Sequence, residues 1–144
     1  MEFDGKRIVV DTNVLLDLVV FHDPGVEALR TAIDTGRVMM VTSPACMEEL
    51  RRVLGYAAFG LGAAAQHEAC GWVVARAVCE PQPPAQALVP RCPDADDQKF
   101  LDLAWVAGAT HLVTKDRALL GLARRMAKLG CCVSSPTEPG LIEV

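Results

Sequence analysis

The chain has 144 residues, of which 51% are hydrophobic, and it carries a formal net charge of −4 with a pI near 5.3. Its length and hydrophobicity fit one compact domain, and we expect residues 1–144 to form it. The negative charge argues against nucleic-acid binding by the whole surface, so any such contact must be local.

The sequence carries no membrane or export signal that we recognise. No apolar run approaches the ~20 uninterrupted residues needed to cross a bilayer. The N-terminus, MEFDGKR, lacks the basic-then-apolar plan of a secretory signal. The six cysteines lie mostly inside apolar segments and form no C-x-x-C pair, which is typical of reduced thiols. We therefore expect a cytoplasmic protein without membrane contact.

Five short runs of β-branched or other apolar residues are typical of buried strands. They lie at residues 7–10, 38–41, 77–80, 111–113 and 131–133, and the run at 77–80 is the weakest. Because the runs are too apolar to have one solvated face, they favour a parallel sheet covered on both sides.

Longer segments between these runs carry apolar residues at spacings of three and four, which is the helical pattern. Asp-Pro at 23–24 and Ser-Pro at 43–44 are typical helix starts, and Gly36 and Gly55 close the segments that follow. Two more helices are predicted within 63–78 and 92–109, and residues 81–93 form an extended proline-rich connection. Strands that alternate with helices predict an α/β fold, a three-layer α/β/α sandwich around a parallel sheet.

Two of the predicted strands lead directly to a carboxylate. Asp11 follows the strand at 7–10, and Asp116 follows the run HLVTK, which contains the strand at 111–113. Functional groups in an open parallel sheet gather just beyond the carboxyl ends of the strands. We expect Asp11 and Asp116 to meet at that edge of the sheet.

Helical phasing selects one acidic residue of the pair at 48–49. Glu48 has Arg51 and Arg52 three and four residues on, which is typical of a solvated ion pair. Glu49 instead shares a stripe with Cys46 and borders the buried face. We predict that Glu49 leans over the sheet edge.

Helical phasing also distinguishes the acidic residues at the predicted helix start, 94–97. Asp96 is followed three residues later by Lys99, whereas Asp97 shares a stripe with Phe100 and Leu101. We therefore predict that Asp97 points inward, toward the same edge.

Each of these carboxylates also has a purely structural explanation. An acidic residue in the first turn of a helix gains about 0.3–1 kcal/mol from the helix dipole, and Asp94 with Asp97 has the spacing of a capping box. Two unit charges about 4 Å apart, however, repel by roughly 4 kcal/mol at an effective dielectric of 20. A cluster of four persists only if a cation is bound or some members are protonated. Oxygen donors without a nearby histidine favour Mg²⁺ or Mn²⁺.

The order and spacing of these segments resemble those of the PIN domain. The resemblance rests on VVDTNVLL, SPACMEELRRVL, DADDQKFLDLAWVAGATHLVTKD and a last strand near CCVSSP, and it runs nearly from end to end. The chain is similar in particular to VapC-type ribonucleases, the toxin components of bacterial toxin-antitoxin pairs. The resemblance implies a parallel five-stranded sheet and a Mg²⁺- or Mn²⁺-dependent nuclease that cuts single-stranded RNA.

The resemblance also implies roles for individual residues. The family's four catalytic and metal-binding acidic positions fall on Asp11, Glu49, Asp97 and Asp116, the set that the phasing selects. Asn13 and Thr114 correspond to polar residues that steady these carboxylates, and Asp94 and Asp96 crowd the third position. If the chain is a toxin, we expect an antitoxin to cover the acidic groove, and the apolar helix near Trp72 would allow a homodimer.

Basic residues that neighbour the acidic positions in the sequence are candidates for RNA contact. They are Lys99, Lys115, Arg117, Arg51 and Arg52. The alternative is that these side chains balance local acidic charge.

The predicted chemistry is in-line attack on a phosphodiester by water that a carboxylate-bound dication activates. Two other functions stay open. A haloacid-dehalogenase-like phosphatase would need a second aspartate two residues after Asp11, where this chain has Asn13. A PIN-like binding module that has lost catalysis would keep the same acidic pocket.

Overall fold

The structure is a computed structural model that describes residues 5–138. Its centre is a five-stranded sheet in the order β3-β2-β1-β4-β5, in which all neighbouring strands are parallel. The strands are β1 Lys6–Val10, β2 Val38–Thr42, β3 Ala77–Cys79, β4 His111–Val113 and β5 Cys132–Ser134. The two edge strands, β3 and β5, are each three residues long. The predicted α/β fold with a parallel five-stranded sheet is confirmed.

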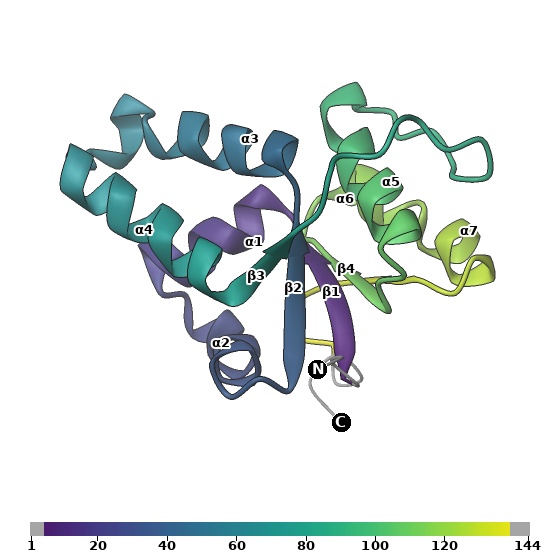
Figure 1. Cartoon of the computed structure of the whole chain (residues 1–144), viewed down its shortest axis with the longest axis horizontal. Helices are drawn as coiled ribbons and strands as arrows, with labels where there is room; N and C mark the ends of the chain where they lie inside the picture. The colour runs from purple at the N-terminus through teal and green to yellow at the C-terminus, as the bar shows by residue number, and fades with distance from the viewer. Residues whose placement is uncertain (1–4, 139–144) are drawn as a thin grey trace.

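Helices cover both faces of this sheet (Figure 1). One face carries α1 Thr12–Leu16, α2 Glu27–Asp34, α3 Pro44–Leu54 and α4 Ala63–Arg76, and the other carries α5 Gln98–Val106, α6 Arg117–Leu120 and α7 Ala123–Lys128. A π-helical turn, η1 Asp17–Phe21, and three 3₁₀ turns, η2 Pro24–Val26, η3 Ala57–Phe59 and η4 Ala95–Asp97, complete the described elements. Within residues 5–138, no helix combines the length and apolar character that a membrane span requires.

The central strand β1 supplies both hydrophobic cores. Ile8 and Val10 pack with the α1–α4 side, whereas Val9 packs with the α5–α7 side. This division follows from the two-residue alternation of side chains along a strand. All three residues are buried, so this end of β1 is covered on both faces, as its sequence predicts, whereas Arg7 near the start of the strand is exposed.

Several predicted boundaries move by a few residues. The helix predicted within 63–78 ends at Arg76, because Ala77 already pairs with β2. The start at 23–24 caps the turn η2, and α2 begins only at Glu27. The last strand is shifted by one residue, which leaves Cys131 buried and Cys132 exposed. The elements α1 and η1 were not predicted as separate elements from the sequence.

The proline-rich connection at 81–93 is tied to the strand ends by Gln82. The Ser43 hydroxyl donates to Gln82 Oε1 at 2.6 Å, and Gln82 Nε2 donates to the Lys99 carbonyl at 3.2 Å. Ser43 also caps α3 by accepting from the Cys46 N–H at 3.2 Å. The connection is thereby joined to the starts of both α3 and α5.

Ser43→Ala should lower the free energy of unfolding by about 1–2 kcal/mol, because it removes a buried helix cap and leaves Gln82 Oε1 without this donor. Urea unfolding monitored by circular dichroism measures the change. Ser135→Ala is the matched control, since within residues 5–138 the Ser135 hydroxyl bonds only Thr137, at an exposed position. Equal effects of the two substitutions would contradict the structural role of Ser43.

Candidate active site

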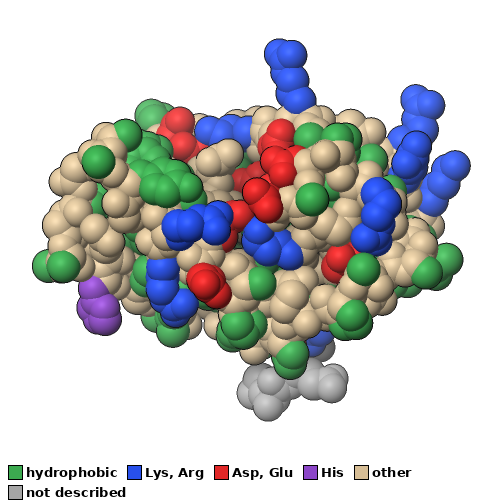
Figure 2. All heavy atoms as spheres, turned by 90° about the horizontal axis from the view of Figure 1, so that it is seen from above, with side chains coloured by type: hydrophobic (Ala, Val, Ile, Leu, Met, Phe, Trp, Pro, Cys, Tyr) green, Lys and Arg blue, Asp and Glu red, His purple; other side chains and the backbone are tan. Residues whose placement is uncertain are grey.

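A pocket of about 240 Å³ opens at the carboxyl ends of the strands. Its acidic lining residues are Asp11, Glu49, Asp94, Asp96, Asp97 and Asp116, and we call it the acidic pocket. Figure 2 looks onto this face and shows acidic side chains near its centre, with basic side chains around them. The four acidic residues selected from the sequence therefore line one pocket, together with the two extra aspartates.

Asp11 is the first residue after β1 and is buried. Its Oδ1 accepts from the Val14 N–H at 3.0 Å and so caps α1, while its Oδ2 accepts from the Thr114 hydroxyl. Burial raises the pKa of Asp11, and the hydrogen bonds from Thr114 and Val14 oppose that rise. Helix capping thus explains one carboxylate oxygen, and a buried threonine holds the other.

Asp116 and Asp97 lie against each other in the acidic pocket. Asp116 caps α6 through a hydrogen bond from the Ala118 N–H at 3.1 Å. Asp97 stands where η4 meets α5 and has no side-chain capping bond. The pKa of Asp97 is raised to about 7, mainly by burial and further by a hydrogen bond to Asp116 and by the charges of Asp116, Asp94 and Asp11. Capping does not explain Asp97.

Glu49 has a different environment. Its Oε1 accepts from Lys99 Nζ at 2.8 Å and lies 3.9 Å from Arg52 Nη2. Its Oε2 accepts from the Thr12 hydroxyl. The prediction that Glu48 pairs with Arg51 or Arg52 is wrong, because no ion pair of Glu48 occurs in residues 5–138 and Arg52 lies instead against Glu49, one helical turn away.

The acidic pocket therefore holds two kinds of carboxylate. Glu49 is neutralised by basic side chains, whereas none of Asp11, Asp97 and Asp116 has an ion pair within the described part of the chain. The three aspartates repel one another, as the raised pKa of Asp97 reflects. Their oxygen-only chemistry fits a hard divalent cation. They are not preassembled for one, since among residues 5–138 no three His, Cys, Asp or Glu side chains form a group that could hold a metal ion.

The other predicted site residues are spread around this pocket. Asn13 is exposed at its wall, and Asp94 and Asp96 are exposed at η4. The Asp94 side chain accepts from the Asp96 N–H at 3.0 Å. The capping-box spacing predicted a bond from the Asp97 N–H to this side chain instead, and that prediction is wrong.

The basic candidates differ in their surroundings. Lys99 pairs with Glu49, and Lys115 pairs with the buried Asp17. Arg117 is exposed beside Asp116, while Arg51 lines a separate hollow with Gln66 and His67. Lys99 and Lys115 therefore already balance acidic charge, which was the alternative explanation for them.

Sequence reasoning named Arg52 only as a possible RNA contact and not as a partner of Glu49, and it missed Tyr56 in the pocket wall. Tyr56 follows Gly55, where the sequence indicated only a turn before the next helix. An aromatic residue in a glycine-rich turn, close after a helix with pocket residues, is a signal that would have found it.

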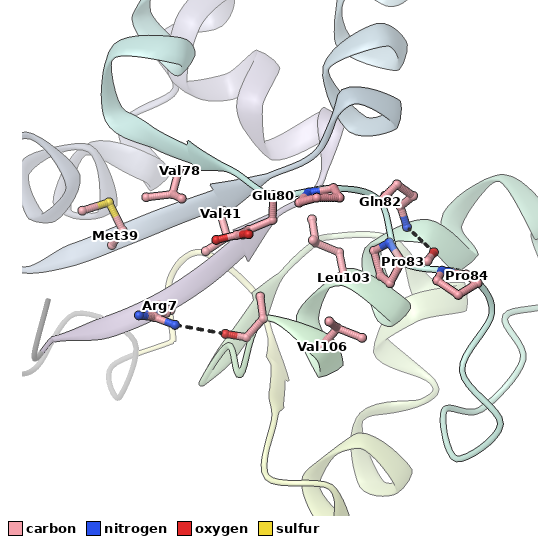
Figure 3. A pocket seen from close by; sticks show the side chains of 12 residues that line it. Arg7, Met39, Val41, Val78, Glu80, Gln82, Pro83, Pro84, Leu103 and Val106 are labelled. Carbon is pink, nitrogen blue, oxygen red and sulfur yellow. Dashed lines mark hydrogen bonds between the residues drawn. The ribbon is translucent and has the colours of Figure 1, made fainter. Parts of the chain in front are cut away.

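A larger groove of about 710 Å³ lies on the α5 side of β2 and β3 (Figure 3). Met39, Val41, Val78 and Leu103 line it, together with Arg7 and Glu80 at its rim. It contains none of the predicted site residues and no group of acids or bases that could cooperate in a reaction. We therefore place the candidate active site in the smaller acidic pocket.

Comparisons with known proteins give the family and the fold of the chain. The family described as PIN domain (PIN_3) matches residues 7–118. Among solved structures, the chain is similar to the crystal structure of PAE2754 from Pyrobaculum aerophilum, with a TM-score of 0.61 and 19% identity over 92% of each chain. At that identity the likeness concerns the fold alone. The comparison with curated proteins found no match.

Asp97→Asn should stabilise the metal-free protein by roughly 1 kcal/mol at pH 8, a modest value because solvent screens this half-buried group. The pKa of Asp97 is raised from 3.8 to about 7 in the folded state, so its contribution to stability is present below pH 3.8 and lost as the pH rises through 7. The substitution should therefore gain less at pH 5 than at pH 8.

Urea unfolding in EDTA at both pH values measures the difference. The exposed Asp96→Asn is the matched control and should show little pH-dependent gain. Destabilisation by Asp97→Asn at pH 8 would show that Asp97 is not under repulsion.

Proposed function

The chain belongs to the PIN-domain family, whose members are typically nucleases, and on that premise we propose that it is a metal-dependent endoribonuclease acting on single-stranded RNA. The observation that carries the proposal is the acidic pocket, where carboxylates from beyond β1 and β4 and from α3 and η4 line one opening. Three of them, Asp11, Asp97 and Asp116, carry charge that no basic side chain in residues 5–138 offsets by an ion pair.

Asp11, Asp97 and Asp116 would hold Mg²⁺ or Mn²⁺ in this pocket. Such an ion, when bound, lowers the pKa of a water ligand and stabilises charge on a phosphoryl group. Thr114 fixes the Asp11 carboxylate, and the α1 and α6 N-termini fix one oxygen each of Asp11 and Asp116. The side chains are thus oriented by the fold itself, except for Asp97, whose half-buried carboxyl is not held by a cap.

The substrate and its cleavage rest on the family resemblance. We propose in-line hydrolysis that leaves a 3′-hydroxyl and a 5′-phosphate, with no side chain acting as a nucleophile. Arg52, with its side chain 62% exposed at the pocket wall, and Arg117 beside Asp116 are available to meet RNA phosphates. A role as the toxin of a toxin-antitoxin pair belongs to the same proposal, with an antitoxin that covers the acidic pocket.

One observation favours a second candidate, a PIN-like binding module without catalysis. Lys99 forms an ion pair with Glu49, which is one of the four acidic positions of the family motif. The carboxylate of Glu49 is therefore already neutralised by a side chain of the same protein. A protein that had lost its metal would tolerate such a contact. Activity measurements separate the two functions.

Purified protein with Mn²⁺ should cleave unstructured RNA, and Asp11→Asn or Asp116→Asn should slow cleavage by about 100-fold or more, because each removes a carboxylate from the ion. Gel analysis of 5′-labelled oligonucleotides measures the rates. Asp23→Asn, which alters an aspartate at the distant turn η2, is the control and should cleave normally. Absence of cleavage with every RNA and metal tried would favour the binding module.

Because Glu49 is neutralised and the three aspartates are not, we expect these carboxylates to contribute unequally to Mn²⁺ affinity. Asp97→Asn should weaken Mn²⁺ binding roughly 10-fold, whereas Glu49→Gln should change it by less than about 3-fold, because Lys99 already neutralises Glu49. Lys99→Met should tighten binding by releasing Glu49, and adding Glu49→Gln to Lys99→Met should reverse that gain.

Isothermal titration calorimetry measures these affinities without relying on activity. Arg117→Met is the matched control, since it removes a positive charge beside Asp116 without freeing a carboxylate. Equal losses from Asp97→Asn and Glu49→Gln would contradict the division and make Glu49 a full ligand.

A further inference from the structure

Three aromatic side chains form a cluster on the surface beside the acidic pocket. The rings of Tyr56 and Phe59 are nearly parallel, with centroids 6.3 Å apart, and Phe21 meets Phe59 edge to face at 5.6 Å. Phe21 is 53% exposed and Tyr56 is 49% exposed. We call these three residues the aromatic platform.

The fold holds the platform in place from two separate segments. Phe21 ends the π-helical turn η1, while Phe59 ends the short turn η3. Gly60 follows with φ +62, a left-handed conformation that favours glycine, and ends the turn η3. The rings therefore contact each other across a sequence separation of almost 40 residues.

Tyr56 belongs both to the platform and to the acidic pocket. The wall of the acidic pocket runs from Glu49 through Arg52 and Val53 to Tyr56. An exposed guanidinium thus lies on the same wall, between the carboxylates and the first ring. On the face seen in Figure 2, hydrophobic side chains gather beside the acidic centre. The platform is continuous with the candidate active site.

We propose that the aromatic platform is a nucleobase-binding subsite, which stacks an unpaired base of the RNA strand whose phosphodiester lies in the acidic pocket. The inference rests on the proposed nuclease function. Unpaired strands are bound by aromatic rings together with cationic groups that follow the backbone, and Tyr56 with Arg52 supplies that combination. The subsite explains how an acidic pocket in an acidic protein retains an anionic substrate, since stacking adds affinity that does not depend on charge.

The chemistry of the surface favours a base over an aliphatic partner. The other large hydrophobic side chains that are exposed in residues 5–138 are aliphatic and lie elsewhere. They are Val74, Val78, Leu88 and Val106. The exposed aromatic rings instead gather beside the acidic pocket, which Tyr56 also lines, and their flat faces suit a flat ligand.

The single tyrosine of the chain offers a direct probe. Incorporation of 3-fluorotyrosine places one ¹⁹F nucleus on Tyr56. We expect an oligoadenylate of about six nucleotides, added in EDTA and low salt to prevent metal-dependent cleavage, to shift this resonance through the ring current of the stacked base. An abasic ribose-phosphate strand of the same length and charge should leave the resonance near its free position.

Substitutions test the affinity. Tyr56→Ala and Phe21→Ala should each weaken oligoadenylate binding about 10-fold in calorimetry and leave abasic-strand binding unchanged. Val106→Ala, which truncates a similarly exposed side chain in the larger groove on the α5 side of β2 and β3, is the matched control and should have no effect. Circular dichroism spectra and melting curves verify that each variant is folded.

The outcomes are distinct. A platform that binds both strands equally, in a protein that cleaves RNA with Mn²⁺, overturns the subsite and leaves the nuclease function standing. Base-dependent binding without any cleavage supports the subsite and counts against the nuclease function. A concentration-dependent dimer in analytical ultracentrifugation that Phe21→Ala dissociates would assign the rings to a second copy of the chain and overturn the subsite.

Discussion

Repulsion between carboxylates governs this site. The parallel sheet delivers Asp11 and Asp116 to one edge, and η4 brings Asp97 against Asp116. Each contact is explicable alone, but together they concentrate negative charge where burial weakens its hydration. The fold resolves part of this problem with Lys99, which neutralises Glu49. The repulsion among Asp11, Asp97 and Asp116 is not offset in this way. A proton on Asp97 or a bound divalent cation can relieve it.

Much of the fold could be predicted from the sequence because its strands are short apolar runs and some of its helices, such as α3, begin with a strong cap. The run at 111–113 coincides with β4, and Ser43 caps α3 as its Ser-Pro start indicated. Asp11 and Asp116 could be paired from topology alone, since parallel strands end at one edge. Helical phasing separated the exposed Glu48 from the half-buried Glu49. These features depend on residues that are close together in the sequence, so the spacing of residue types is enough to predict them.

The remaining features depend on distances between remote segments. Periodicity gives the side of a helix on which Lys99 lies, but the ion pair to Glu49 depends on how closely α5 approaches α3. The aromatic platform joins η1 to η3 across two intervening helices, and no local pattern marks Phe21 as a neighbour of Phe59. The choice of Arg52's partner is similar, because Glu48 and Glu49 both lie within one helical turn of it. Packing angles decide such contacts.

The shortness of the two outer strands affects how molecules meet in a concentrated solution. A sheet rim presents unpaired backbone donors and acceptors, and a long rim can nucleate fibres by accepting a strand from a neighbouring molecule. β3 and β5 each present only three residues, so such a neighbour would gain few backbone bonds. The short edge strands therefore disfavour amyloid-like stacking of sheets from different molecules. A redesign that lengthened β3 or β5 would weaken this protection.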